Sequence, residues 1–309
     1  MTLPDLIAEQ NDAAPSPLVG THTAAVSRGR LVLRRFVRKR MALLGAVTLA
    51  LLFMAAFIGP HLTKWSYSDT DYSAFLKPPS RSHWFGTSQI GQDMYAQTMR
   101  GLQKSLIIGL LAALVTTGVA AIVGACAGYF GGWIDRFATW VIDLLLVLPS
   151  FLITAILSPA FRGKTWLLFV LLLSAFYWMI TARVVRGLTL SLREREFIKA
   201  AQFMGVPSRK IIFRHLLPNM ASLLIIDATI NVGGTIVLET SLSYFGLGIQ
   251  PPDVSLGTLI ADGTNFALTF PWMFLFAAGL LILTVLSVSL VGDGLRDALD
   301  PTAGSGRSH

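Results

Sequence analysis

The sequence predicts an all-α membrane protein with six transmembrane helices. Of its 309 residues, 53% are hydrophobic and 14% are charged, whereas about a quarter of the residues of a soluble domain are charged. The apolar residues gather in runs long enough to cross a hydrocarbon core of about 30 Å, which takes roughly 20 helical residues. Each run should be helical, because a lone strand would leave its backbone hydrogen-bonding groups unsatisfied in lipid.

Six apolar runs divide the chain, and each is expected to form one span. Four of them contain no charged residue: 41–59, 105–134, 165–182 and 265–292. Two contain acidic residues. The run 137–161 contains Asp143, and the run 220–248 contains Asp227 and Glu239.

The distribution of Lys and Arg predicts how these spans are oriented. The chain has a formal net charge of +8, and most of its basic residues precede the first span or lie between the fourth and fifth spans. Cytoplasmic loops of membrane proteins are enriched in Lys and Arg, so both termini are expected in the cytoplasm. The basic surplus therefore sets topology and suits contact with anionic membrane lipid, and no nucleic-acid partner is expected.

This topology predicts a multi-pass protein of the cell membrane with five segments. They are a basic, partly disordered cytoplasmic tail (1–40), a first membrane anchor (41–59), an external loop (60–103), a five-helix core (104–295) and a cytoplasmic tail (296–309). The core includes a charged cytoplasmic loop at residues 193–219.

The sequence contains no motif for enzymatic chemistry. A nucleotide-binding loop needs Gly, four residues, and then Gly-Lys-Ser/Thr, so that backbone amides can surround the phosphates. The Gly163-Lys164-Thr165 triplet lacks the upstream glycine, because Ser158 stands there. Zinc-protease and serine-hydrolase motifs are also missing. The chain is therefore not expected to be an enzyme or to bind a cofactor.

The charged loop 193–219 predicts a docking element in water. A helix is expected over 194–204, with Gly205 ending it in a left-handed conformation and Ser208 capping a second short helix. Phe197, Ala200, Ala201 and Met204 recur at helical spacing and predict one shallow apolar face ringed by basic residues. On physical grounds alone, the same helix could instead lie on the inner leaflet.

This loop also resembles the cytoplasmic loop of permease subunits of ABC-type importers. That loop carries Ala-Ala, a glycine four residues later, and Leu-Pro about a dozen residues further on. The resemblance favours docking onto an ATPase. It assigns the contact to Glu196, Phe197, Ala200, Ala201, Met204, Gly205, Leu217 and Pro218. Lys199 stands where the broader pattern has Glu, so a salt bridge attributed to that Glu is not carried over.

Two further motifs resemble the oligopeptide, dipeptide and nickel branch of these permeases. Residues 83–88 read His-Trp-Phe-Gly-Thr-Ser, and Gly-Gln-Asp follows at 91–93. The branch usually has Asp and Arg where this chain has Ser88 and Gln92. Residues 239–248 give the acidic residue, Ser-Leu-Ser and Gly-Leu-Gly that are typical of the branch. A Gly-rich turn at the membrane interface also explains the first motif.

The resemblance implies the type I ABC importer permease fold and import of oligopeptides, dipeptides or a related solute by alternating access. It also implies a second homologous permease, two cytoplasmic ATPase subunits or domains that hold ATP and Mg, and an external substrate-binding protein. An alternative is a secondary transporter that is driven by an ion gradient and uses its intramembrane carboxylates. A membrane-embedded structural or assembly protein is a third class.

The acids within the spans are the remaining candidate site residues. A carboxylate at the bilayer centre costs about 2.5–3.5 kcal/mol on insertion scales, so each should face protein or water. Asp143 is expected to pair with Arg183 or Arg186, or else to line the pathway; we favour the ion pair. Glu239 is expected at a gate, at a receptor contact or at the membrane interface. Asn231 stands at helical spacing from Asp227 and can hydrogen-bond across helices.

Overall fold

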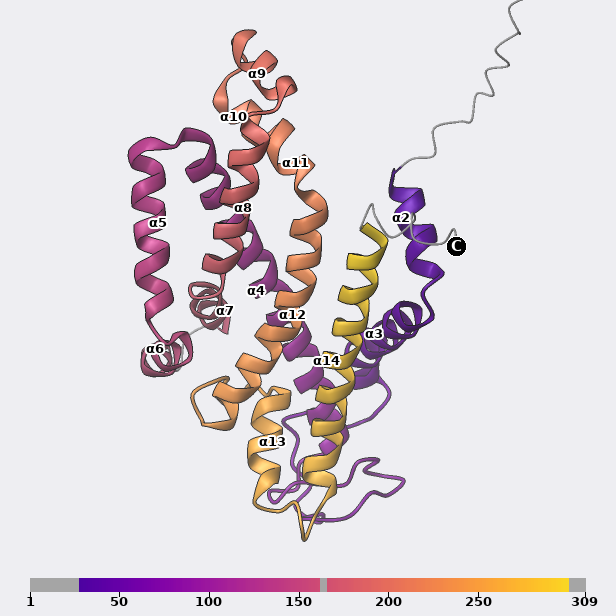
Figure 1. Ribbon diagram of the computed structural model, residues 1–309. Coiled ribbons are helices and arrows are strands. Elements are labelled where there is room, and N and C mark those ends of the chain that lie inside the picture. The colour runs from indigo at the N-terminus through magenta and orange to yellow at the C-terminus, as the bar shows by residue number, and fades with distance from the viewer. Residues whose placement is uncertain (1–27, 162–165, 300–309) are drawn as a thin grey trace, which may run out of the picture.

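The structure is a helical bundle built around one long helix. The computed structural model describes residues 28–161 and 166–299, where regular structure is helical apart from two isolated β-bridges. The long helix, α4 (Met94–Phe130), crosses the bundle in Figure 1. It packs most extensively against α8 (Trp178–Arg193) and α12 (Ala221–Tyr244). The expected all-α class is confirmed.

Within the described residues, four helical segments are long and apolar enough to cross a membrane. These are α3 (Arg40–Ile58) with the short turn η1 (Gly59–His61), then α4, α12 and α14 (Trp272–Leu299). Two bent helix pairs bring the total to six when each pair counts as one span. The six expected runs therefore all correspond to helical structure, but not all to straight helices.

Both bent pairs break at a recognisable feature. The expected third span divides into α5 (Gly132–Val147) and α6 (Ser150–Leu157), bent by 82°. Leu148 is extended because the ring of Pro149 disfavours helical backbone in the residue before it. The expected fourth span divides into α7 (Trp166–Ser174) and α8, bent by 48°. There the hydroxyl of Ser174 bonds back to the Val170 carbonyl at 2.8 Å, a contact that often bends helices.

Several expected boundaries differ from those in the structure. The expected external loop 60–103 ends in helix, because Asp93 caps α4 and its carboxylate accepts from the Ala96 amide at 2.8 Å. The expected fourth span stops too early, since α8 continues to Arg193. Part of the tail 1–40 is helix α2 (Arg28–Val37), and α14 reaches Leu299. The disorder expected before residue 28 lies outside the described residues, as does the tail from 300 onward.

The segment between η1 and α4 forms a cap at one end of the bundle. His83 is buried at its centre, with Nδ1 2.8 Å from Asp93 and Nε2 3.4 Å from Asp71. Its ring stacks on Trp65. The 83–93 motif therefore fixes the start of α4, as its interpretation as a structural turn implies.

Close helix approach at glycine holds α4 against α8. A Cβ on Gly124 would lie 2.4 Å from the Ala182 carbonyl oxygen, and one on Gly128 would lie 2.7 Å from that of Arg186. Small residues allow such backbone contact between membrane helices, which supplies packing where lipid gives no hydrophobic driving force. The half of α4 that ends at Phe130 is therefore fixed against α8.

Helices α9 (Glu196–Phe203) and α10 (Ser208–Ile211) lie at one end of the bundle, and α2 lies toward the same end. The cap and α13 (Leu256–Thr264) lie at the opposite end (Figure 1). Charge bias predicts that the α9 end is cytoplasmic.

Thiol labelling tests that orientation. With Cys126 replaced by Ala, a cysteine at exposed Ser73 of the cap should react with an impermeant maleimide added outside intact cells. A cysteine at exposed Gln202 of α9 should react only after the membrane is opened. External labelling at Gln202 would reverse the predicted topology.

The glycine contact gives a second prediction. Gly124→Val should destabilise the bundle by about 1–3 kcal/mol, because the added carbons meet α8 backbone that cannot rotate away. Gly118→Val on the same helix is the matched control, since nothing lies within 4 Å of a Cβ there. Thermal unfolding in detergent should separate the two variants, and equal midpoints would contradict the contact.

Candidate functional site

The 193–219 loop is a compact helix–turn–helix unit whose turn depends on Gly205. Helix α9 ends at Phe203, and Gly205 has φ +71°. The Val206 amide donates to the Ala201 carbonyl and the Gly205 amide to that of Gln202, both at 3.0 Å. This pair of bonds is the Schellman motif, in which a left-handed residue closes the helix end. The expected role of Gly205 in ending the helix is confirmed.

The second half of the loop differs from the expectation at Ser208. Pro207 occupies the N-cap position, and Ser208 is the first residue of α10 and makes no capping bond. The Pro207 carbonyl accepts from Lys210 at 2.8 Å and Ile211 at 3.1 Å, so the backbone alone starts the turn. The chain continues through a π-helical turn, η3 (Ile212–Leu216), into α11 (Leu217–Asn219).

Ala201 was predicted to lie on the exposed apolar face of α9, and this prediction is wrong. Ala201 is buried beside Ile198 in a core shared with Ile211, Leu216 and the end of α4. The buried stripe is centred on Ile198, and a rotation of about 100° per residue brings Ala201 to the same side.

The outward side of the loop is apolar at three large residues. Phe197 is 46% exposed, Met204 74% and Phe203 91%. Ala200 is exposed beside them, as is Glu196 in the first turn. Phe203 was missed because it lies off the predicted stripe. A large apolar side chain in the last turn of a helix expected to face water could have predicted that Phe203 belongs to a contact surface.

Polar contacts fasten the loop to the end of α4. The Arg193 guanidinium donates to the Tyr129 carbonyl at 3.1 Å, and the Gln202 amide donates to the Tyr129 hydroxyl at 3.4 Å. Lys199 pairs with Glu194 at 3.0 Å, and this bond lowers the pKa of the Glu194 carboxyl. Leu217 begins α11 and is half-buried against the same core, and Pro218, the next residue, is exposed. The loop and the end of α4 thus form one packed unit.

Asp143 on α5 pairs with Arg183 on α8. The alternative partner, Arg186, bonds instead to Asp135 on the first turn of α5, with Nη2 2.7 Å from Oδ2. Sequence reasoning missed Asp135 because it precedes the apolar run. The Arg183 and Asp143 side chains are 54% and 56% exposed, so their pair lies on the outside of this chain.

Asp227 joins three helices. One carboxylate oxygen accepts from Thr181 of α8 at 2.6 Å, and the other accepts from Thr117 of α4 at 2.9 Å and Asn231 at 2.8 Å. The Asn231–Asp227 bond lies within α12. The expected bond of Asn231 across helices is made to Thr117 at 3.5 Å. Asp227 also lines a cavity of about 480 Å³ between α8, α12 and the end of α14.

Glu239 is fully buried, so its side chain faces neighbouring helices rather than a receptor or lipid. Its carboxylate accepts from Ser105 of α4 at 3.2 Å and from Ser243 at 2.7 Å. The Ser105 hydroxyl in turn accepts from the Leu256 amide at the start of α13, at 3.3 Å. Ser243 lies one helical turn beyond Glu239, and this spacing in the sequence could have predicted the hydrogen bond between the two side chains. Ser105 could be found only in the structure.

The ion pairs of α5 and α8 give a third prediction. Asp143→Arg should lower the yield of folded protein, and Arg183→Asp in the same chain should partly restore it. We expect a coupling of about 0.6–1.7 kcal/mol, the range of polar contacts between membrane helices. Arg186→Asp is the matched control and should not rescue Asp143→Arg, because Arg186 bonds to Asp135. Rescue by both arginine variants would contradict the specific pairing.

Comparisons with known proteins agree with this architecture. Residues 105–304 match the family described as binding-protein-dependent transport system inner membrane component. Residues 27–79 match the N-terminal TM domain of oligopeptide transport permease C.

The chain is also similar to several curated proteins. It is 56% identical to the oligopeptide transport system permease protein OppC of Mycobacterium tuberculosis H37Rv, over 92% of this chain and 98% of that protein. It is 36% identical to a putative peptide permease protein of Brucella suis biovar 1, over 87% and 89% of the two chains. It is 34% identical to OppC of Bacillus subtilis strain 168, over 86% and 87%.

These matches cover the spans, the loop 193–219 and the acids of α5 and α12. They do not support the alternative of a secondary transporter driven by an ion gradient. The matched family consists of transport components rather than enzymes. The chain belongs to the family of inner-membrane components of binding-protein-dependent transport systems, and it is a multi-pass permease of the ABC importer class.

Proposed function

We propose that this chain is one of two permease subunits of an importer that moves oligopeptides, dipeptides or a related solute into the cell. The names of its relatives support a peptide substrate. The observation that carries the mechanism is the α9–α10 loop, which presents apolar side chains to water while it is fastened to α4.

The exposed side of the loop suits a protein partner. Helix α9 lies at one end of the bundle in Figure 1. Phe197, Phe203 and Met204 are large apolar residues exposed on this helix and the turn after it, and an uncovered apolar patch marks an interaction site. Arg195, Arg209 and Lys210 are exposed around the patch and favour an acidic rim on the partner. We assign the partner as a cytoplasmic ATPase subunit or domain, which would hold ATP and Mg. Ala200, Glu196 and the Leu217–Pro218 corner complete the proposed contact.

Packing gives a route from this contact to the membrane. Ile198 and Ala201 join the loop to the core at the end of α4, and Arg193 and Gln202 bond to Tyr129 there. Helix α4 also contacts both acids of α12. Movement of the docked loop would therefore move α4 together with α12, which both acids bond to it, and nucleotide state would bias the inward–outward equilibrium.

The outer surface of α5 favours a second homologous permease as the partner within the membrane. Four large apolar residues along this helix are at least half exposed: Trp133, Phe137, Trp140 and Leu144. Asp143 of α5 and its partner Arg183 of α8 are also more than half exposed, and such a pair needs a polar or protein environment. We propose that this face meets the second permease beside the pathway, and that an external binding protein delivers substrate to the opposite end from α9.

The fourth prediction tests the docking patch. Phe203→Asp should leave the spans inserted but abolish most ATP-driven uptake, because it places a charge in an apolar contact. Purified transporter should also lose its ATPase subunits. Leu268→Asp, the same change at a fully exposed residue between α13 and α14, is the matched control for subunit loss and should keep the ATPase subunits. Normal uptake by Phe203→Asp would return α9 to the role of a helix lying on the inner leaflet.

Gly205 supplies a second variant for the same test. Gly205→Val should strain the left-handed turn by roughly 1–2 kcal/mol and misdirect α10. Gly187→Val, which also meets open space but lies in ordinary helix, is its control. Hydrolysis of ATP that no longer drives uptake is the expected result for Gly205→Val alone.

A further inference from the structure

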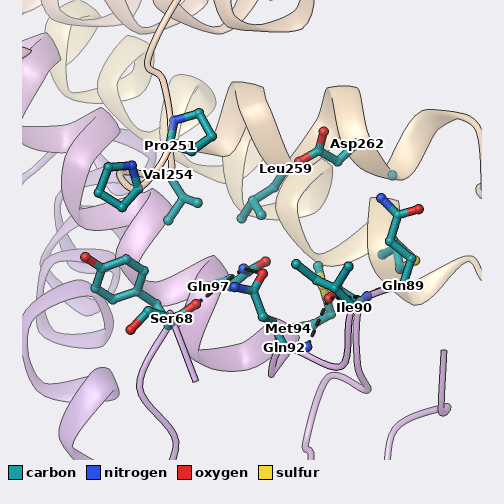
Figure 2. Close-up of a pocket in the computed structure, with 15 residues that line it drawn as sticks. Ser68, Gln89, Ile90, Gln92, Met94, Gln97, Pro251, Val254, Leu259 and Asp262 are labelled. Atoms are coloured by element: carbon teal, nitrogen blue, oxygen red, sulfur yellow. Dashed lines mark hydrogen bonds between the residues drawn. The ribbon is translucent and has the colours of Figure 1, made fainter. Parts of the chain in front are cut away.

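Two adjoining cavities lie at the end of the bundle opposite α9. The smaller, of about 260 Å³, lies between the cap, the Pro251–Pro252 segment and α13 (Figure 2). The larger, of about 630 Å³, lies between the end of α12 and α13. Gln89, Pro251, Val254 and Asp262 line both cavities. Together they reach the size of an ordinary small-molecule site.

The smaller cavity combines an apolar wall with amide side chains. Val254 and Leu259 lie across from Gln92 and Gln97 in Figure 2. The side-chain nitrogen of Gln97 donates to the side-chain oxygen of Gln92 at 2.5 Å and to the backbone carbonyl of Tyr67 at 3.3 Å. Those bonds leave the nitrogen of Gln92 as a donor and the oxygen of Gln97 as an acceptor. One donor beside one acceptor is what a peptide group requires.

The wall shared by the two cavities is negatively charged. Among the residues that the structure describes, Asp262 is the only charged one lining the smaller cavity, and the larger cavity adds Asp253. Asp253 is already neutralised, because Lys104 lies 3.0 Å from it and Arg100 3.5 Å. Within residues 28–161 and 166–299, no donor or basic side chain contacts the Asp262 carboxylate. Its partial removal from water raises the pKa of Asp262.

We propose that these cavities form an entry subsite for the amino-terminal end of a short peptide, with its ammonium group on Asp262. The amides of Gln92 and Gln97 would contact the first peptide group, and the apolar wall would accept a side chain with little selectivity. This inference rests on the proposed function, since it places the substrate at the end where an external binding protein would release it.

An ammonium group is the ligand that best satisfies this site. Asp262 is exposed on the shared wall of the two cavities, so its carboxylate is open to a cation that enters them. A hydrogen bond between charged groups is about twice as strong as a neutral one. A peptide amino terminus supplies the cation and an adjoining amide in one molecule.

Photo-cross-linking in the assembled transporter tests this site without requiring ATP. A benzophenone amino acid placed at Ile90, which lines the smaller cavity, should label radioactive tri-alanine in proteoliposomes. Unlabelled tri-alanine should compete about tenfold better than N-acetyl-tri-alanine, since acetylation removes the charge. Asp262→Asn should abolish that difference. Asp293→Asn, the same change at an exposed position on α14, should preserve it.

Three results would overturn the subsite. One is equal competition by the free and acetylated peptides, and another is unchanged preference in Asp262→Asn. The third is cross-linking of Ile90 to the binding protein alone, which would identify the cavity as a docking surface. Labelling with the expected preference but without ATP-driven uptake would support the subsite and refute the proposed function. ATP-driven uptake without labelling at Ile90 would support the proposed function and refute the subsite.

Discussion

Polar groups inside the hydrocarbon have no water to bond with, and this constraint decides how the bundle is joined. Helix α12 carries two carboxylates, and each is held by hydroxyl or amide donors rather than by a lone cation. Asp227 takes its donors from α4, α8 and α12 itself, whereas Glu239 takes them from α4 and α12. Both acids therefore fix α12 to α4, at points twelve residues apart along α4 (Ser105 and Thr117).

Helix α4 connects the two ends of the molecule because it is also held at its own ends. At one end Asp93 caps it and bonds to His83, so the cap is tied to its first turn. At the other end Tyr129 accepts bonds from the loop. A rigid element of about 55 Å, at 1.5 Å per residue, thus links the proposed peptide end to the proposed ATPase end. The start of α13 is bonded to α4 through Ser105, so the wall that carries Asp262 belongs to the same connected unit.

The elements that could be predicted are those that depend on neighbouring residues in the sequence rather than on contacts with other helices. Apolar runs identified the spans, and Gly205 marked the end of α9 because few other residues tolerate a left-handed turn. The break before Pro149 was equally local and was overlooked, since counting apolar residues hides a bend inside a run. The helical start of α4 was missed because its first turns are polar, and Asp93 is a readable cap only once the helix is known to begin there.

By itself, the sequence determined the membrane class, the approximate spans, the position of the loop and the resemblance to importer permeases. Only the tertiary structure decided that Asp143 takes Arg183 while Arg186 takes Asp135, that Glu239 and Ala201 are buried, and that Asp262 lies between two cavities. The physical reason is rotation about the helix axis. In a helix that is apolar on every side, such as α12, periodicity does not show which face meets a neighbour, and packing against α4 settles it.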